Sequence, residues 1–342
     1  MSGTAPAVVG RVRSLVQPAL RAAVDRLDDE RMRRIAGYHL GWLDPDGRPV
    51  EGGAGKAIRP VLAVLSAQAG GGTETDGIPP AVAVELVHNF SLLHDDFMDR
   101  DVERRHRPTG WVVFGEGQAI LAGNAMLTAA IDVLVREGET TQRCLPCLLD
   151  AVQRLISGQS ADLALESQPS VELDEVLRME TNKTAALLSC ASSMGALAVG
   201  APAEVIAGLA GYGHELGVAF QLVDDILGIT GDAEVTGKSS SSDVRAGKRS
   251  APIVAALRSG TRASSQLAGL FEGGPPTSED DIIYATKLID EAGGLDWAAR
   301  EADRRLALAL EHLRVIGLPE APADGVGAQF AELARYVVER DR

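Results

Sequence analysis

The sequence contains few residues of the kinds that build β-rich or disulfide-bonded proteins. Aromatic residues make up only 4% of the 342 positions, and runs of alternating β-branched residues are almost absent. These two shortages disfavour a β-sandwich or a barrel and leave an aliphatic core. Cys144, Cys147 and Cys190 are the only cysteines. Three thiols are too few for a disulfide framework, and their odd number fits the reducing cytoplasm, so we expect a cytoplasmic protein.

Positive charge is also scarce. Asp and Glu number 48 against 33 Lys and Arg, which gives a net charge of -15 and disfavours nonspecific binding to nucleic acid or to an anionic membrane. The N-terminal segment has no continuous apolar stretch of the signal-peptide kind. Residues 185–203 are uncharged, but they are rich in Ala, Gly and Ser and include Pro202, which indicates a buried helix. We expect neither a nucleic-acid partner nor integral membrane association.

Helical periodicity runs through nearly the whole chain, so the predicted fold class is all-α. Glycine and proline clusters separate the segments, and no composition shift marks a linker, so residues 1–342 are expected to form a single domain. The predicted helices span about 7–35, 56–70, 79–106, 114–136, 142–167, 172–199, 202–231, 250–259, 264–273, 279–293, 295–315 and 325–340.

Two aspartate-rich segments, HDDFMDRD at 94–101 and QLVDDILGITGD at 221–232, interrupt this helical pattern. Asp95 and Asp99 are four residues apart, so on a helix they share one face and can hold a hard divalent cation together. Asp224 and Asp225 follow an apolar stretch, which places their charges at the inner end of a buried helix. Such carboxylates would repel one another unless metal ions bound them.

Basic residues recur near these segments. Lys56 and Arg59 begin an apolar helix, and others follow each acidic segment or stand between the two: Arg104, Arg105, Lys183, Lys238, Arg245, Lys248 and Arg249. Any single pair could be a surface ion pair, and residues 232–250 could be only a solvated loop. Together, the two signs of charge in separate clusters suit a diphosphate that is bound through metal ions and through direct Lys and Arg donors.

Six segments resemble the trans-isoprenyl diphosphate synthases, or polyprenyl synthetases. They are GKAIRP, LVHNFSLLHDDFMDRDVERRHRPT, GQAILAGNAML, NKTAALL, FQLVDDILGITGD and GKSSSSDVRAGKRSAP, in the family's order from about residue 50 to 257. The resemblance implies one large helical bundle with a central active-site cavity and a homodimer. It also implies three Mg²⁺ ions per active site, with isopentenyl diphosphate and an allylic diphosphate as substrates.

The resemblance assigns roles to particular residues. The metal ligands would be Asp95, Asp96, Asp99, Asp224 and Asp225, with Asp101 in support. The allylic diphosphate would contact Arg104, Lys183, Lys238 and Lys248, and isopentenyl diphosphate would contact Lys56, Arg59, His88 and Arg105. Thr184 and Gln221 would line the path of the carbocation.

The sequence departs from the family pattern at two positions. Gly228 stands where many members have the third aspartate of the second motif, and Asn124 replaces a common aspartate. We expect Mg²⁺ binding to survive, because in the family the residue at the position of Gly228 often reaches the metal only through water. Phe90 and the small Ser91 precede Asp95 without an insertion in DDFMD, which resembles the geranylgeranyl type and predicts Phe90 as the floor for the growing chain.

Several other functions stay open from the sequence. The product could be farnesyl or a longer polyprenyl diphosphate. The chain could also be a terpene cyclase of the same fold, which takes up no second diphosphate, or a non-catalytic partner subunit, which would tolerate Gly228. The His94-Asp95 pair could belong to a phosphohydrolase, and Cys144 and Cys147 could form a redox or zinc site. Packing within the core is the simpler interpretation of both pairs.

Overall fold

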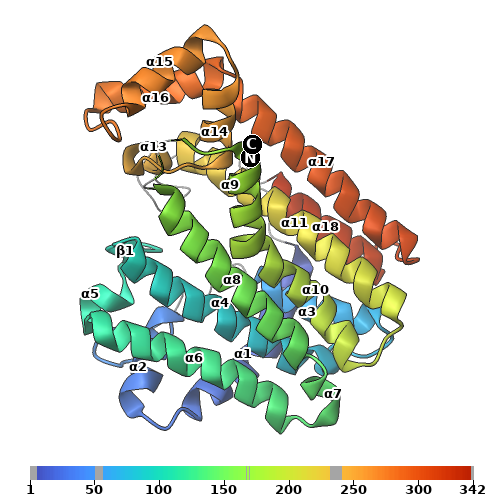
Figure 1. Ribbon diagram of the computed structural model, residues 1–342. Coiled ribbons are helices and arrows are strands. Elements are labelled where there is room, and N and C mark those ends of the chain that lie inside the picture. Colours follow the sequence, from blue (N-terminus) through green and yellow to red (C-terminus); the bar gives the residue numbers. More distant parts are fainter. Residues whose placement is uncertain (1–5, 51–56, 167, 169, 232–240, 340–342) are drawn as a thin grey trace.

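The computed structural model describes residues 6–50, 57–166, 168, 170–231 and 241–339, and nearly all its elements are helices (Figure 1). The α-helices are α1 (Ala7–Asp25), α2 (Glu30–His39), α3 (Ile58–Ala69), α4 (Ile78–Met98), α5 (Gly110–Phe114), α6 (Glu116–Arg136), α7 (Glu139–Gln142), α8 (Leu145–Glu166), α9 (Leu173–Glu180), α10 (Ala186–Ala198), α11 (Ala203–Thr230), α13 (Ser242–Ala246), α14 (Ala251–Arg258), α15 (Arg262–Phe271), α16 (Glu279–Glu291), α17 (Gly294–Val315) and α18 (Val326–Val338). A 3₁₀ turn, η1 (Thr75–Gly77), precedes α4, and a π-helical turn, η2 (Thr181–Ala185), joins α9 to α10. The all-α prediction is confirmed.

The first predicted helix, 7–35, is in fact two helices. The side chain of Asp29 accepts hydrogen bonds from the backbone N–H groups of Arg31 and Met32, at 2.7 and 3.1 Å. An N-cap of this kind satisfies the first free N–H groups of a new helix, so α2 begins at Glu30 in a new direction. Periodicity alone did not reveal this break, because both helices carry apolar residues at helical spacing.

The helix predicted over 79–106 ends earlier, at Met98. The chain then forms a small antiparallel hairpin of β1 (Glu103–Arg104) and β2 (Arg107–Pro108). The two residues between the strands, Arg105 and His106, have φ angles of 53° and 58°. Two consecutive positive φ angles fit the twist of a two-residue hairpin. Arg104 and Arg105 therefore lie on a hairpin and not on the helix that carries the aspartates.

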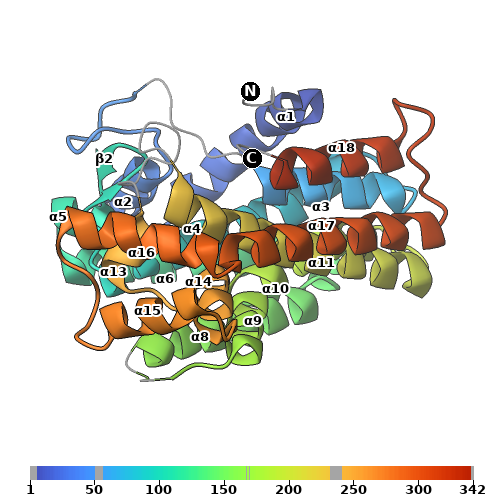
Figure 2. The same ribbon diagram turned by 90° about the horizontal axis from the view of Figure 1, so that it is seen from above.

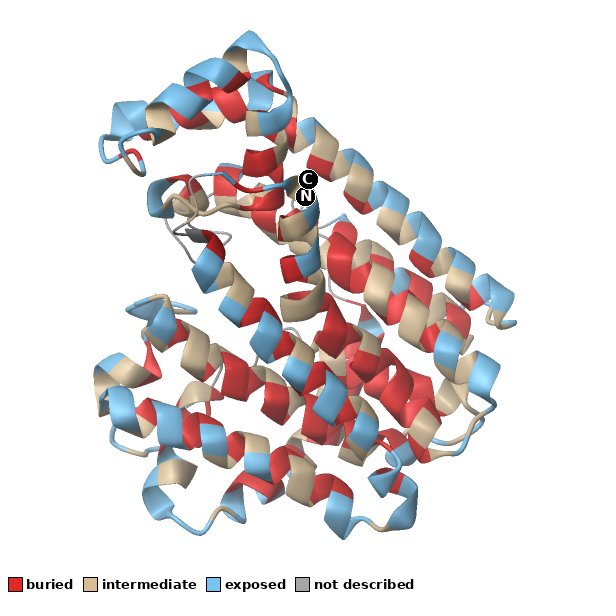
Figure 3. Ribbon diagram, in the orientation of Figure 1, coloured by how far each residue is buried: buried red, intermediate tan, exposed pale blue. Residues whose placement is uncertain are grey.

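The central helices are α3, α4, α10 and α11. α10 packs against both α3 and α11, and α4 packs against both α3 and α6. Figure 1 shows α10 near the centre of the bundle, and Figure 2 shows the same helices from above. Figure 3 shows that most of the buried ribbon lies in this central region. α10 is buried along nearly its whole length, as predicted for the uncharged segment 185–203, because its Ala, Ser and Gly side chains let neighbouring helices approach closely.

Buried apolar side chains form two clusters. The larger, which we call the main core, draws on α1–α4, α6, α8–α11, α17 and α18. The smaller, which we call the C-terminal core, contains Ile229, Val244, Ile253, Ala256, Leu267, Ile282, Ala285, Leu288, Ile289 and Ala292. α14 contributes to both, with Val254 in the main core and Ile253 in the C-terminal core. In Figure 1 the pair α15–α16 lies at the top, away from the central helices.

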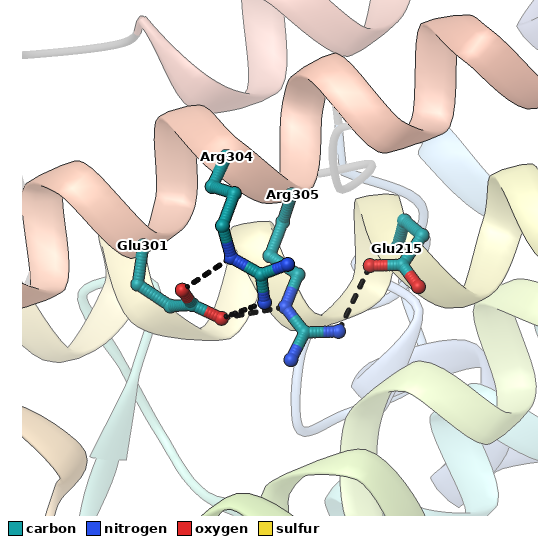
Figure 4. A network of polar contacts seen from close by, with 4 residues as sticks. All are labelled: Glu215, Glu301, Arg304 and Arg305. Atoms are coloured by element: carbon teal, nitrogen blue, oxygen red, sulfur yellow. Dashed lines mark hydrogen bonds and ion pairs between the residues drawn. The ribbon is translucent and has the colours of Figure 1, made fainter.

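α17 packs along α11, and buried charge supports this pairing (Figure 4). Nη1 of Arg305 on α17 lies 2.9 Å from Oε2 of Glu215 on α11. Nε of the same arginine lies 2.8 Å from Oε1 of Glu301, which also binds Arg304. Because these side chains are mostly shielded from water, removing one partner would leave an uncompensated charge in the helix interface.

The three cysteines are free thiols. Cys144 and Cys190 are buried, and Sγ of Cys144 donates a hydrogen bond to the carbonyl oxygen of Met194 on α10, at 3.2 Å. Burial raises the pKa of Cys144 to about 12, so its thiol is inert as a nucleophile. Sγ of Cys147 lies 3.7 Å from Oγ of Ser193, so both thiols of the CxxC pair contact α10.

Within the described residues, α6 is the one helix whose length and apolar composition would allow it to cross a membrane. Core helices of other proteins pass the same test, and 44% of its most apolar stretch is buried against the rest of the chain.

Candidate active site

A cavity of about 390 Å³ lies between α4, α8, α11 and the α13–α14 segment. Its lining brings together two motifs that are far apart in the sequence. The lining residues are Leu92, Asp95, Asp99, Asp101, Arg104, Asp162, Met179, Glu180, Lys183, Thr184, Gln221, Asp224, Asp225, Leu227, Gly228, Ser242, Asp243, Lys248, Arg249 and Ser250. Apart from three leucine and methionine side chains and Gly228, the lining is polar or charged.

The first aspartate motif contributes Asp95 and Asp99 from the last turn of α4. The backbone N–H of Asp99 donates to the carbonyl oxygen of Asp95 at 2.8 Å, which closes the helix and stacks the two residues on one face. Burial raises the pKa of Asp95 to about 6; Lys183 opposes this shift and Asp99 adds to it. The two aspartates therefore repel each other in a partly dry site, as expected of a cation-binding pair.

Asp96, between them, faces another way. It is 1% exposed and does not line the cavity. Its Oδ1 accepts a hydrogen bond from Nε of Arg104 at 2.6 Å, so it holds the first strand of the hairpin against α4. This contact places Arg104 at the edge of the cavity. The metal role of Asp96 stays a prediction.

Lys183 projects into the cavity from the π-helical turn η2. Its Nζ lies 2.6 Å from Oδ2 of Asp162 on α8. Burial opposes its charge, but Asp162, Asp95 and Asp99 together outweigh burial and raise the pKa of Lys183. The amine is therefore a permanent cation near neutral pH. A π turn inserts one extra residue into a helix and re-aims the side chains at that point, often at functional sites.

α8 passes unusually close to this turn. A Cβ atom added to Gly158 would lie 2.3 Å from the backbone N and 2.7 Å from Cα of Lys183. Only glycine fits this contact, because the neighbouring atoms are backbone and cannot move away cheaply. Gly158 thus fixes the distance between the helix of Asp162 and the turn of Lys183.

A chain of hydrogen bonds connects Thr184 to α14. Oγ1 of Thr184 donates to Oε1 of Gln221 at 2.6 Å, and Nε2 of Gln221 donates to Oδ1 of Asp225 at 2.7 Å. The backbone N–H of Ala251 donates to the other oxygen of Asp225, at 3.2 Å. Glu180 is buried beside Asp225, and both burial and Asp225 raise its pKa well above the usual range. The raised pKa favours the protonated form of Glu180, and Asp225 is held in place by Gln221 and by the backbone of Ala251.

The second wall of the cavity consists of Asp224 and Gly228 on α11 together with Asp243, Lys248 and Arg249. Burial opposes the charge of Lys248, but Asp243, Asp99 and Asp162 outweigh it and raise its pKa. The loop predicted over 232–250 contains the short helix α13, in which Val244 is buried. Arg245 points elsewhere and pairs with Glu279 on α16.

A second basic group adjoins the cavity. Arg59 on α3 is buried, which lowers its pKa, while Glu85 and Asp224 act in the opposite direction. Burial, Arg59 and Arg105 lower the pKa of His88 well below its usual range, so this ring is neutral. Glu85 lies among these residues, and its carboxylate accepts a hydrogen bond from Nδ2 of Asn89 at 3.0 Å.

The structure thus gathers most of the residues predicted for the metal and the allylic diphosphate around one cavity. Arg59, His88 and Arg105 lie beside it, whereas Lys56 and Lys238 lie outside the described residues. Phe90 and Ser91 are buried in α4 and do not line the cavity. The ring of Phe90 packs edge-on against that of His94, with 5.0 Å between centroids.

Three acidic lining residues were not predicted: Asp162, Glu180 and Asp243. Asp162 and Glu180 each stand alone in an ordinary helical pattern, so only the fold reveals that they meet Lys183 and Asp225. Asp243 had a usable signal. The segment SDVRAG ends in Gly247 with a φ of 66°, a glycine C-cap that predicts a short helix.

The lining fits Mg²⁺ in one particular way. Among the described residues, no three His, Cys, Asp or Glu side chains converge closely enough to hold a metal ion by themselves. Mg²⁺ commonly binds one or two carboxylates and completes its shell with water and substrate phosphates. Asp95 with Asp99 on one wall and Asp224 on the other, with cationic side chains between them, match this arrangement.

A helical bundle whose central cavity combines two aspartate motifs with lysine and arginine donors defines a class of enzymes that act on prenyl diphosphates. The sequence profile of the polyprenyl synthetase family matches residues 49–289. The chain belongs to this family and is a trans-prenyl diphosphate synthase, a prenyltransferase.

The relatives agree on the class and differ in product. A (2E,6E)-farnesyl diphosphate synthase of Mycobacterium tuberculosis is 44% identical over 97% of this chain and 92% of its own length. A geranylgeranyl diphosphate synthase of the same organism is 42% identical over 91% of each chain.

Solved structures show the same fold. A polyprenyl synthetase from Streptomyces coelicolor superposes with a TM-score of 0.91 at 46% identity, over 98% of this chain and 100% of that one. A geranylgeranyl pyrophosphate synthase from Corynebacterium glutamicum, solved with isoprenyl diphosphate and magnesium, has a TM-score of 0.84 at 27% identity, over 99% and 100%.

Proposed function

We propose that the protein is a Mg²⁺-dependent enzyme that condenses isopentenyl diphosphate with dimethylallyl, geranyl or farnesyl diphosphate, and that its main product is geranylgeranyl diphosphate. The observation that carries the proposal is the single cavity in which Asp95, Asp99 and Asp224 face Lys183 and Lys248. Such a site binds one diphosphate from two sides. The separate basic residues around Arg59 provide a binding site for a second diphosphate.

The allylic diphosphate would lie in the cavity. When its carbon–oxygen bond ionises, negative charge develops on the leaving diphosphate, and Arg104, Lys183 and Lys248 stabilise that charge from fixed positions. Asp162 and Asp96 hold two of these donors in place through the 2.6 Å contacts with Lys183 and Arg104. Mg²⁺, when bound at Asp95, Asp99 and Asp224, adds positive charge and orients the diphosphate oxygens. We propose three ions per site, with Lys238 as a further donor.

The carbocation needs surroundings that cannot attack it. Leu92, Met179 and Leu227 give the cavity its apolar portion, and the hydroxyl of Thr184 and the amide of Gln221 supply weak dipoles. No histidine is among the described residues that line it. We propose that the proton lost after bond formation passes to the released diphosphate, which acts as the base.

Isopentenyl diphosphate would bind at Arg59, His88, Arg105 and Lys56. The neutral state of His88 suits it to donate one hydrogen bond without adding charge. The negative charge of Glu85 partly compensates the positive charges of Arg59 and Arg105 before the substrate binds. The two diphosphates would then be held side by side, so that the double bond lies close to the ionising carbon.

One assay tests this function against its alternatives. Purified protein is incubated with Mg²⁺, labelled isopentenyl diphosphate and each allylic diphosphate, and the products are sized. Label in a twenty-carbon chain is the expected result. Cyclic hydrocarbon without label would indicate a terpene cyclase, and no turnover by the purified chain would indicate a partner subunit. Asp95→Ala and Lys183→Ala should each abolish turnover without unfolding the protein.

Product length is proposed from α4. At 100° per residue, Ser91 lies about 40° around the helix axis from Asp95, and Phe90 about 140°. Ser91 therefore lies on the same side of α4 as Asp95, one turn deeper, whereas Phe90 lies on another side and packs against His94. We expect Ser91→Phe to shorten the product towards farnesyl diphosphate, because a ring there would obstruct the tail. Phe90→Ala should lengthen it by opening space behind Ser91, and an unchanged product profile would remove Phe90 as the floor.

We also propose that the chain acts as a homodimer in the cytoplasm. Leu149, Ile156 and Leu163 on α8 recur every seven residues and are exposed, and Leu121 and Val135 on α6 are exposed as well. Both helices lie on the near side in Figure 1. Exposed apolar rows of this kind on helices commonly pack against a second subunit.

A further inference from the structure

Gly228 and Asp243 pack directly against each other, and the carboxylate of Asp243 fits only because position 228 has no side chain. A Cβ atom added to Gly228 would lie 2.5 Å from Oδ2, 2.6 Å from Cγ and 2.9 Å from Oδ1 of Asp243. The carboxylate of Asp243, which comes from α13, therefore occupies the space into which a side chain at position 228 would extend. Both residues line the cavity.

The carboxylate of Asp243 lies where the third aspartate of the second motif, at position 228, would place its own carboxylate. Position 228 follows Asp224 by one helical turn, so the two share one face of α11. An aspartate at 228 would direct its carboxylate from that face into the cavity. Here α11 has no side chain at that point, and Asp243 brings a carboxylate to it from a different element.

The charges around Asp243 agree with this location. Its negative charge is the first of the carboxylate influences that raise the pKa of Lys248, and it also raises that of Asp225. Helix preference does not explain Gly228. Within a helix glycine costs about 1 kcal/mol relative to alanine, so alanine would be preferred at a helical position with open space around it.

We propose that Asp243 replaces the absent acid of the second aspartate motif, and that Gly228 is glycine because it makes room for this carboxylate. The inference rests on the proposed function, since it gives Asp243 a role towards the Mg²⁺ ion at Asp224. Asp243 is a positioning residue for that ion, and α13 is part of the metal site and not only a cover over it.

The test relocates the acid. Mn²⁺ binding in the presence of saturating inorganic diphosphate is measured by electron paramagnetic resonance, which counts bound ions without turnover. Asp243→Ala should weaken the last-filled Mn²⁺ by about tenfold or more, the usual effect of losing a carboxylate that supports a metal. The double variant Gly228→Asp with Asp243→Ala should regain most of that affinity.

Gly228→Ala supplies a second measurement. In the parent protein this substitution should lower the affinity for the same Mn²⁺ ion, because the added methyl group displaces the carboxylate of Asp243. Thermal stability should stay equal or rise. In the Asp243→Ala background the same change should have no further effect on Mn²⁺, so the two changes are strongly non-additive. Asp280→Asn, an exposed acid on α16, serves as the control and should leave binding unchanged.

The outcomes separate this inference from the proposed function. Unchanged Mn²⁺ affinity in Asp243→Ala, or a folded double variant that regains none, would overturn the role of Asp243. A loss of diphosphate affinity with unchanged Mn²⁺ dependence would also overturn it, because Asp243 would then only orient Lys248. If the parent binds Mn²⁺ and diphosphate as expected but never elongates a prenyl chain, the proposed function fails while this inference stands.

Discussion

The surroundings of individual carboxylates in the cavity favour the binding of a cation. Asp95 has a pKa of about 6, above its usual value of 3.8, chiefly because it is buried. Without metal, the folded protein therefore binds the proton of Asp95 more tightly than the unfolded chain does. Its contribution to stability is greatest below pH 4 and falls as the pH rises through about 6.

Asp95→Asn should therefore stabilise the metal-free protein while destroying its metal site. At pH 7.5 in EDTA we expect the free energy of unfolding to rise by roughly 1–3 kcal/mol, the order of magnitude that such a pKa difference implies. Near pH 4 the gain should vanish. Urea unfolding at both pH values measures it, with Asp280→Asn as a control for simple charge removal; an unchanged free energy at pH 7.5 would contradict the prediction.

Asp162 should matter through Lys183. Asp162→Asn keeps the shape but removes the charge that holds the amine at 2.6 Å, so turnover should fall by about tenfold or more as the lysine loses its fixed position. Binding of inorganic diphosphate should weaken as well. Glu204→Gln, an exposed acid at the start of α11, should leave both unchanged. Full activity in Asp162→Asn would show that Lys183 does not depend on this partner.

At the scale of elements, the sequence predicts regular helices well and their interruptions poorly. The predicted ranges for α3, α6, α8, α11 and α14–α18 agree with the structure to within a few residues, because each carries a long apolar period bounded by Gly or Pro. The missed features include the Asp29 cap, the hairpin at Arg105, the π turn and the short helices α5, α7 and α13. Each depends on one or two residues with special backbone geometry, which an average over a whole turn conceals.

The contact between α8 and η2 yields a sharp prediction. Gly158→Ala places a methyl group within 2.3 Å of backbone at Lys183, so α8 and the π turn must separate. We expect a loss of about 2 kcal/mol or more in the free energy of unfolding, together with a large loss of turnover. Thermal denaturation and the elongation assay measure the two effects.

A matched glycine offers the control. Gly269 on α15 is exposed, and an added Cβ atom there would meet nothing within 4 Å. Gly269→Ala should stabilise the helix by up to about 1 kcal/mol and leave turnover unchanged. Equal effects of the two substitutions would mean that the close approach of α8 is not tight in solution.

For the whole molecule, the cavity lies where the two cores meet. Asp95, Asp99 and Lys183 stand on elements of the main core, whereas Asp243 and Lys248 belong to the α13–α14 region, which contributes to the C-terminal core. Sequence reasoning found most residues of both walls, since their motifs are local. It could not find their partners across the cavity, because Asp162 and Glu180 reach Lys183 and Asp225 only when α8, α9 and α11 are packed together.

Ligand binding should therefore connect the two cores. Adding Mg²⁺ and inorganic diphosphate should slow amide hydrogen exchange in α13 and α14, and in the C-terminal turns of α4 and α11. Exchange in the first turns of α11, about 30 Å along the helix axis from Asp224, should change little. Mass spectrometry of peptic fragments measures this pattern, and uniform protection of the whole chain would contradict it.

The proposed dimer makes a prediction of its own. Ile156→Asp introduces charge into the exposed apolar row of α8 and should reduce the mass in light scattering from twice the 35.9 kDa of one chain to a single chain. Ile283→Asp on α16, which is 66% exposed and remote from that row, should leave the mass unchanged. Identical masses for the two variants would place the interface elsewhere.

The hairpin after α4 has a further consequence for how the reaction is arranged. Arg104 lines the main cavity, and its neighbour Arg105 lines a small pocket beside Glu85 and Asn89. One peptide bond thus separates the donor assigned to the allylic diphosphate from that assigned to isopentenyl diphosphate. On this assignment the hairpin is a partition between two anions, and Asp96 anchors it from beneath. The hairpin backbone then keeps the two arginines adjacent through successive rounds of elongation, while the tail changes in length.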